Sequence, residues 1–204
     1  YMNKIAVGPE AQHVIDINAP VKANLVWIAK ARGEKVQDLT VMILDRPRHE
    51  QLITEVRQTG ARIRLIPDGD VIGSLMTCLP ESGIDVMLGI GGSPEAIIAA
   101  CALRAAGGNM QAKLYPRTPE EQQAGEKLGY DVNKVLSIED LVSSEDTFFA
   151  ATGVTRGELL AGVDYFAGGA ITESIVLRGL TGTLRRIRAT HRLDKLDQIS
   201  MIDY

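Results

Sequence analysis

The sequence is poor in cysteine, histidine and aromatic residues and lacks long apolar or basic runs, which excludes several classes of protein. No apolar stretch approaches the roughly 20 residues that a membrane-spanning helix needs, so we expect no membrane association. The formal net charge is −4 and the sequence has no long basic run, so it does not indicate a positively charged surface that would bind nucleic acid. The two cysteines, Cys78 and Cys101, lie in apolar runs without metal-site spacing. We expect reduced, buried thiols in a cytoplasmic protein rather than a disulfide.

Length and composition predict a single α/β domain over residues 1–204. The chain is long enough for one sizeable core, and its composition shows no break between the two halves. Strands are predicted at residues 5–7, 39–44, 62–66, 84–88 and 111–115. Helices are predicted at 18–32, 49–59, 71–79, 94–106 and 118–128. This alternation implies right-handed crossovers and a mainly parallel sheet with helices.

The last third of the chain has a different pattern. Residues 147–152, 171–177 and 183–190 resemble strands, and their connections are rich in glycine. We therefore expect antiparallel strands to be added at a sheet edge towards the C-terminus.

The most informative stretch is Gly89-Ile-Gly-Gly-Ser-Pro-Glu95, which follows one apolar run and opens another. It predicts a strand, a phosphate-type loop and a helix with Ser93 as its N-cap. Gly91 and Gly92 let the backbone approach a ligand closely, and open amides at a helix start favour an anion. A carboxylate beside an anion is repulsive unless a divalent cation lies between them, so Glu95 is a candidate metal ligand. The same residues also fit a plain strand-to-helix turn in which Glu95 complements the helix dipole.

Three successive predicted strands end in polar loops, and the carboxyl ends of parallel strands meet at one edge of a sheet. These loops are Arg46-Pro47-Arg48, Asp68-Gly69-Asp70 and the glycine stretch. Arginine forks suit a phosphate, and short acids accept hydrogen bonds from sugar hydroxyls. Together the loops predict a site for a phosphorylated sugar with a divalent cation.

Each loop also has a purely structural explanation. Asp-Gly is common turn chemistry, so Asp68-Gly69-Asp70 fits a simple turn as well. Arg46 and Arg48 also fit surface ion pairs or the end of a helix. We expect no ligand role for the three histidines, His13, His49 and His191.

Several motifs resemble those of class II fructose-1,6-bisphosphatase, the GlpX type, in order along essentially the whole chain. They are Tyr1-Met-Asn-Lys-Ile, Asp45-Arg-Pro-Arg-His49, Ile66-Pro-Asp-Gly-Asp70, the glycine stretch, Ala151-Thr-Gly-Val-Thr155 and the closing residues 187–193. The resemblance implies a layered α/β sandwich of the lithium-sensitive sugar-phosphatase superfamily. It also implies hydrolysis of the 1-phosphate of fructose 1,6-bisphosphate in gluconeogenesis, with Mn²⁺ or Mg²⁺. We further expect a homo-oligomer that binds a small-molecule sugar bisphosphate.

Carried over position by position, the resemblance implies one metal ligand, Glu95. It implies substrate contacts from eight residues: Tyr1, Arg46, Pro47, Arg48, Asp68, Gly69, Asp70 and Gly92. Tyr1 and the arginines are expected at phosphate. Relatives often have lysine where Arg46 stands, so the contact geometry differs there, and Ala96 replaces a glycine usual in relatives.

The family's Asp-Pro-x-Asp/Glu-Gly-Thr element, which carries further metal ligands and a threonine that positions water, does not occur in this sequence. The resemblance places that element upstream of the tyrosine matched by Tyr1. We therefore expect the C-terminal portion of a longer enzyme, which supplies substrate contacts and one metal ligand but no identified catalytic residue. The alternatives are a noncatalytic sugar-phosphate-binding or assembly module, and a dual fructose-1,6-/sedoheptulose-1,7-bisphosphatase.

Overall fold

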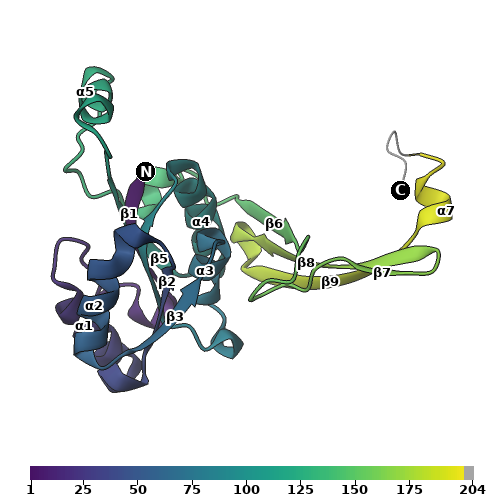
Figure 1. The fold of residues 1–204 in the computed structure, drawn as a ribbon, viewed down its shortest axis with the longest axis horizontal. Helices are drawn as coiled ribbons and strands as arrows, with labels where there is room; N and C mark the ends of the chain where they lie inside the picture. The colour runs from purple at the N-terminus through teal and green to yellow at the C-terminus, as the bar shows by residue number, and fades with distance from the viewer. Residues whose placement is uncertain (200–204) are drawn as a thin grey trace.

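Four layers of secondary structure make up the fold in the computed structural model, which describes residues 1–199 (Figure 1). In order, the layers are helices α1 (Val21–Arg32) and α2 (Glu50–Thr59), a first sheet, helices α3 (Asp70–Met76) and α4 (Ser93–Ala106), and a second sheet. The predicted layered α/β architecture is confirmed. Residues 200–204 of the predicted domain lie outside the described part of the chain.

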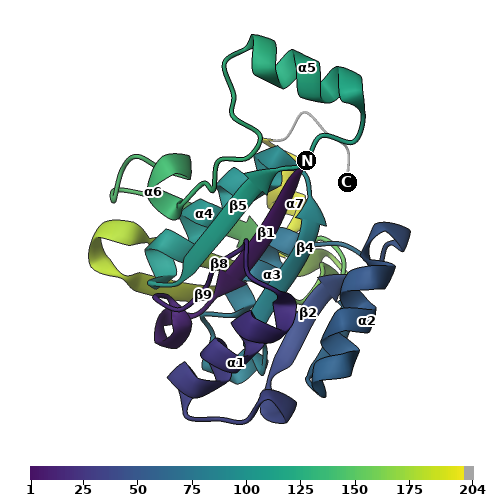
Figure 2. The same cartoon turned by 90° about the vertical axis from the view of Figure 1, so that its left-hand side faces the viewer.

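The first sheet has five strands in the order β3-β2-β4-β1-β5. Their bounds are β1 (Met2–Val7), β2 (Thr40–Leu44), β3 (Arg62–Ile66), β4 (Val86–Gly91) and β5 (Asn109–Leu114). Strand β2 pairs in parallel with β3 and β4, whereas β1 pairs antiparallel with β4 and β5. Four strands therefore run in one direction and β1 runs against them, so β1 begins at the edge where the others end (Figure 2).

Strand β2 of the first sheet is apolar on both faces because helices cover both. In β2, Val41 and Ile43 belong to the cluster with α1 and α2, whereas Met42 and Leu44 belong to the cluster with α3 and α4. Burying each such side chain contributes roughly 1.5–3 kcal/mol. The two-sided burial explains why this strand is a continuous apolar run in the sequence.

Helix α4 is packed between the two sheets. Ala96, Ala99 and Ala100 contact the first sheet's cluster, whereas Ala102 and Ala105 contact the second sheet's cluster. Alanine lets a helix approach both sheets closely. Helix α4, whose N-terminus carries the end of the glycine stretch, is thereby held from two sides.

The second sheet is antiparallel throughout. It contains β6 (Phe148–Thr152), β7 (Asp164–Phe166), β8 (Gly169–Arg178) and β9 (Thr183–Arg192). Strand β8 pairs with β6 and β7 along one edge and with all of β9 along the other. Phe149, Ile175 and Leu177 pack against Leu75 of α3. The open end of the β8–β9 hairpin, opposite its turn and beside β7 and α7, projects away from the body (Figure 1). The predicted C-terminal antiparallel strands are confirmed, but they form their own sheet rather than extending the edge of the first.

Some element boundaries differ from the sequence predictions. Strand β1 begins at Met2 rather than residue 5, and β4 continues through Gly91, so part of the predicted loop is strand. The N-cap of α4 is Gly92 rather than Ser93. Helix α3 ends at Met76 instead of residue 79. The first three residues of the glycine stretch are therefore held in place by pairing with β1.

Shorter elements complete the described chain. They are helices α5 (Pro119–Lys127), α6 (Ile138–Leu141) and α7 (Leu193–Leu196), and the 3-10 turns η1 (Pro9–Ala11), η2 (Val36–Asp38), η3 (Pro47–His49), η4 (Pro80–Ser82) and η5 (Gly179–Thr181). Helix α5 was predicted and stands out from the body (Figure 1). None of the helices within residues 1–199 is long and apolar enough to cross a bilayer. Cys78 and Cys101 are free thiols, as predicted, but both side chains are only partly buried rather than buried.

Candidate functional site

One edge of the first sheet gathers the start of β1 and the carboxyl ends of its neighbours. Because β1 runs against the other strands, Met2 pairs with Gly91 on one side and Leu114 on the other. The N–H of Tyr115 donates to the carbonyl oxygen of Tyr1 at 2.9 Å. Tyr1, 41% exposed, therefore lies where the loops after the parallel strands emerge (Figure 2). Ligands of open α/β sheets bind outside this edge.

Arg48 joins the arginine loop to the glycine stretch. Its Nε and Nη2 donate to the carbonyl oxygen of Ile90 at 3.0 and 2.8 Å. Its guanidinium carbon lies 5.6 Å from the centre of the Tyr1 ring, within cation–π distance. A guanidinium has five N–H donors, so Arg48 can hold the loop and still bind an anion. Three segments distant in sequence are thus brought together.

His49 forms a second link between the same two loops. The N–H of Ile90 donates to Nε2 at 2.8 Å, so Nδ1 carries the proton and donates to the carbonyl oxygen of Leu44 at 2.7 Å. The ring is buried, and burial lowers the pKa of His49, with the positive charge of Arg48 acting in the same direction. This neutral imidazole aligns the end of β2 with the end of β4. Backbone groups thus occupy both ring nitrogens of His49.

Arg117 also belongs to this edge, although the sequence analysis did not select it. Its guanidinium carbon lies 4.5 Å from the centre of the Tyr1 ring, so Tyr1 contacts two arginines. Glu121 in α5 accepts hydrogen bonds from Arg117, and this pairing lowers the pKa of Glu121 to about 2. Arg117 follows the end of β5. The strand-end rule that selected the other loops could have found it.

The Asp68–Asp70 loop divides between two environments. Gly69 has φ +87° and is the N-cap of α3, a conformation that suits glycine. Asp68 is exposed at the turn, whereas Asp70 is buried and pairs with the ammonium of Lys4 in β1. The sequence analysis missed Lys4, although a lysine between Met2 and Ala6 is unusual on an apolar strand face.

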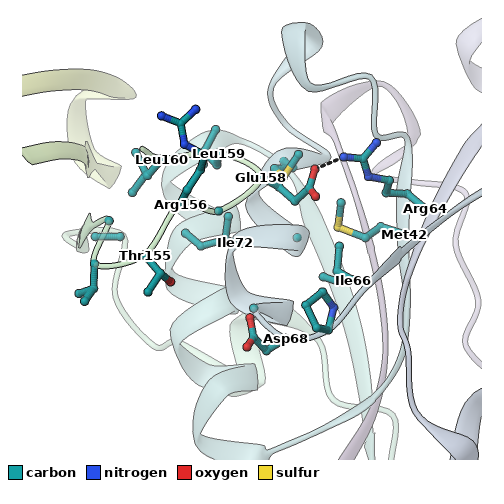
Figure 3. Close-up of a pocket in the computed structure, with 18 of the residues that line it drawn as sticks. Met42, Arg64, Ile66, Asp68, Ile72, Thr155, Arg156, Glu158, Leu159 and Leu160 are labelled. Carbon is teal, nitrogen blue, oxygen red and sulfur yellow. Dashed lines mark hydrogen bonds and ion pairs between the residues drawn. The ribbon is translucent and has the colours of Figure 1, made fainter. Parts of the chain in front are cut away.

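A cavity of about 690 Å³ opens beside Asp68 and Gly69 (Figure 3). Its far wall is residues 151–160, which include Thr155, Arg156 and the motif that resembled the sugar-bisphosphatases. Glu158 of this wall pairs with Arg64 of β3. The loop after the second sheet's first strand therefore faces the Asp-Gly-Asp loop across an open, mixed polar and apolar space.

The start of α4 combines open amides with one carboxylate. Gly92 is the N-cap, and the Glu95 side chain folds back so closely that a Cβ on Gly92 would overlap its carboxylate. Glu95 is exposed in the first turn, where the helix dipole favours its charge. An incoming cation or anion at this end would therefore meet Glu95 beside the backbone of Gly92.

Metal-binding side chains do not converge within residues 1–199. No group of three or more His, Cys, Asp or Glu residues in this range is arranged to hold a metal ion. One carboxylate with backbone groups does not make a tight site for Mg²⁺ or Mn²⁺. These residues alone do not fit a complete catalytic metal centre.

Arg46 and Pro47 occupy different roles from Arg48. Pro47 begins the η3 turn that leads to His49, whereas the Arg46 guanidinium donates to the carbonyl oxygen of its neighbour Asp45 at 3.0 Å. The structure thus brings Tyr1 and Arg48 into one contact group, while Arg46 is exposed beside it.

Fold and edge together define an α/β protein whose polar groups gather at the carboxyl ends of a mainly parallel sheet. The family described as "Bacterial fructose-1,6-bisphosphatase, glpX-encoded" matches residues 1–191, and the chain belongs to this family. It is 43% identical to the class 2 fructose-1,6-bisphosphatase of Haemophilus influenzae, over 98% of this chain and 64% of that relative. It is 41% identical to fructose-1,6-bisphosphatase 1 class 2 of Escherichia coli K12, over 97% of this chain and 62% of that relative. The chain therefore spans a little under two thirds of the length of these relatives.

Proposed function

We propose that this chain supplies the substrate-binding part of a fructose-1,6-bisphosphatase, which hydrolyses the 1-phosphate to give fructose 6-phosphate and phosphate in gluconeogenesis. The observation that carries the proposal is the contact group of Tyr1, Arg48 and Ile90 in a chain of this family. It presents permanent positive charge at the edge where α/β sheets bind ligands.

The residues of the edge have distinct proposed roles. Arg48 and Arg117 flank Tyr1 and would bind a phosphate by charge-assisted hydrogen bonds. Asp68, exposed at its turn, would accept hydrogen bonds from sugar hydroxyls. Gly92 would place the first amides of α4 near a second anionic group. Arg46, Pro47, Gly69 and Asp70 complete the proposed substrate set.

Glu95 is the proposed metal ligand of this chain, with Mn²⁺ or Mg²⁺ as the ion. Its exposed carboxylate at the start of α4 supports the assignment, and hard divalent cations prefer oxygen ligands. Such an ion would stabilise charge that develops on the phosphate. Further ligands would come from outside the described residues, because no three His, Cys, Asp or Glu side chains within residues 1–199 are arranged to hold a metal ion.

Phosphate release from fructose 1,6-bisphosphate, with Mn²⁺ or Mg²⁺ added, tests the proposal. We would compare this chain with a longer version carrying the upstream part of a family relative. We expect turnover in the longer version and a large loss of kcat in its Glu95→Gln variant, with little change in substrate affinity. Full metal-dependent turnover by Glu95→Gln would refute the ligand assignment. An inactive longer version would refute hydrolysis.

A noncatalytic sugar-phosphate-binding or assembly module is the second candidate. The lone carboxylate at the start of α4 favours it, because the described residues do not assemble a three-ligand metal site. Calorimetric binding of fructose 1,6-bisphosphate without phosphate release by either version would support this candidate. Parallel kinetics on sedoheptulose 1,7-bisphosphate would show whether the enzyme is dual.

Three broader properties are proposed with these functions. The shared clusters around α4 support a single domain, which one cooperative unfolding transition would test. The long exposed strand β9 supports a homo-oligomer, which light scattering would test. Free thiols at Cys78 and Cys101 agree with a cytoplasmic location, which imaging of a tagged protein would test.

A further inference from the structure

A buried ion pair lies beneath the glycine stretch and joins two other segments of the site. The ammonium of Lys4 in β1 pairs with Oδ2 of Asp70 at the start of α3. Lys4 is 4% exposed, and the Asp70 side chain 11%. Removing two charges from water is costly, and mutual attraction offsets this cost only when the geometry is good. This pair therefore constrains where β1 and α3 meet.

Lys4 reaches Asp70 from within the apolar core. It lies opposite Gly89 of β4 and Ala112 of β5 in the sheet register. Its neighbours on the same strand face, Met2 and Ala6, belong to the cluster beneath α3 and α4. The aliphatic stem of a lysine can pack in such surroundings while its ammonium reaches a polar partner. Lys4 therefore interrupts the apolar face of β1, between Met2 and Ala6, at the point where Asp70 approaches the strand.

Gly91 lies directly over this pair. A Cβ on Gly91 would overlap the Asp70 carboxylate and lie 2.8 Å from Nζ of Lys4. Gly91 is therefore required by the charges beneath it, in addition to any close approach of a ligand from above. It precedes Gly92, the N-cap of α4, so the pair supports the backbone that carries the proposed anion-binding amides.

We propose that Lys4 is a positioning residue of the candidate site. It holds the Asp70 carboxylate under Gly91 and thereby fixes the glycine stretch relative to the Asp68–Asp70 loop. The pair is neutral overall, so its contribution to an anion is geometric rather than a gain in positive charge. Only the identity of the ligand rests on the proposed function.

Amide hydrogen exchange without ligand tests this role. Lys4→Met removes the charge and keeps an unbranched stem, whereas Lys113→Met is the control on the adjacent strand β5, where Nζ contacts Asn18 Oδ1 at 3.0 Å on the exposed side. We expect at least tenfold faster exchange at Gly91, which pairs with Met2, in Lys4→Met relative to amides of β2, and no such change in the control. Unchanged protection at Gly91 would overturn the proposal.

A double-mutant cycle tests whether Lys4 acts through Asp70. We expect Lys4→Met not to speed the exchange at Gly91 any further once Asp70→Leu is present, because the two substitutions remove one interaction and the second also removes the ammonium that the first leaves unpaired. The double variant leaves no unpaired buried charge, so it keeps the test open if Lys4→Met alone does not fold. A full additional effect of Lys4→Met in the Asp70→Leu background would overturn the proposed route.

Binding of inorganic phosphate connects the pair to the ligand. We expect Lys4→Met to raise the Kd about tenfold, while Lys113→Met leaves it unchanged. Faster glycine exchange without any loss of phosphate affinity would refute a role in positioning the site. If the wild-type chain does not bind phosphate, the proposed function fails, whereas the exchange experiment still decides whether Lys4 holds the glycine stretch.

Discussion

Replacing His49 with phenylalanine should destabilise the protein even though the core volume stays filled. The ring links the carbonyl oxygen of Leu44 and the N–H of Ile90 at 2.7 and 2.8 Å, and phenylalanine leaves both groups unpaired. Each unsatisfied buried group costs about 1–3 kcal/mol, so we expect the free energy of unfolding to fall by roughly 2–6 kcal/mol. That is a large share of the roughly 5–15 kcal/mol that stabilises a typical domain.

The pH dependence of this loss follows from the lowered pKa of His49. The unfolded state binds a proton more readily than the folded state, so the stabilisation is present above the ordinary histidine pKa of about 6.5 and is lost as pH falls through the folded pKa. The stability difference between wild type and His49→Phe should therefore shrink from pH 8 towards pH 5. Its slope is at most about 1.4 kcal/mol per pH unit.

Urea unfolding at several pH values measures both effects. His13→Gln is a suitable control, because His13 is exposed and its replacement should change stability by less than about 0.5 kcal/mol. A His49→Phe variant as stable as wild type at pH 8, or a difference independent of pH, would refute the bridging role.

Three further predictions concern other parts of the site and core. Gly91→Ala should lower the free energy of unfolding in urea by about 2 kcal/mol, whereas Gly125→Ala, in open space on α5, should raise it by about 0.5–1 kcal/mol. Equal effects of the two substitutions would contradict the packing at Gly91. Burial raises the pKa of the Cys78 thiol to about 12. Its alkylation at pH 7.5 should therefore be about 1,000-fold slower than that of a solvent-exposed thiol. Rapid labelling of Cys78 in the folded protein would contradict this. In the longer active version, Arg48→Ala should raise KM by the equivalent of about 2–3 kcal/mol, and Arg48→Lys should restore KM only partly. An unchanged KM in Arg48→Ala would show that Arg48 does not bind the phosphate.

The sequence predicted those elements that combine a strong pattern with clear end signals. Strand β3 matches its predicted bounds, and α2 ends at Thr59 before Gly60, whose φ of +83° explains the glycine. The two-sided apolar run of β2 predicted a buried strand because both faces meet helices. The short elements β7 and α7 were missed because three or four residues cannot show a periodic pattern.

The site was predicted only in part, for a reason of topology. Strand-end loops could be assigned to one edge from the sequence, but the antiparallel direction of β1 is a long-range pairing that local patterns do not encode. That direction brings Tyr1 beside Arg48 and Arg117. Likewise, the pair between Lys4 and Asp70 spans 66 residues of sequence and depends on the packing of α3 against β1.

We propose that the edge formed by Tyr1, Arg48 and the glycine stretch binds a phosphorylated sugar. Amide chemical shifts of the 204-residue chain, followed during titration with fructose 1,6-bisphosphate, test it most directly. We expect saturable shifts at Met2, Arg48, Gly91 and Gly92, with β9 unaffected. Shifts confined to β9 and the second sheet, or none at millimolar ligand, would contradict it.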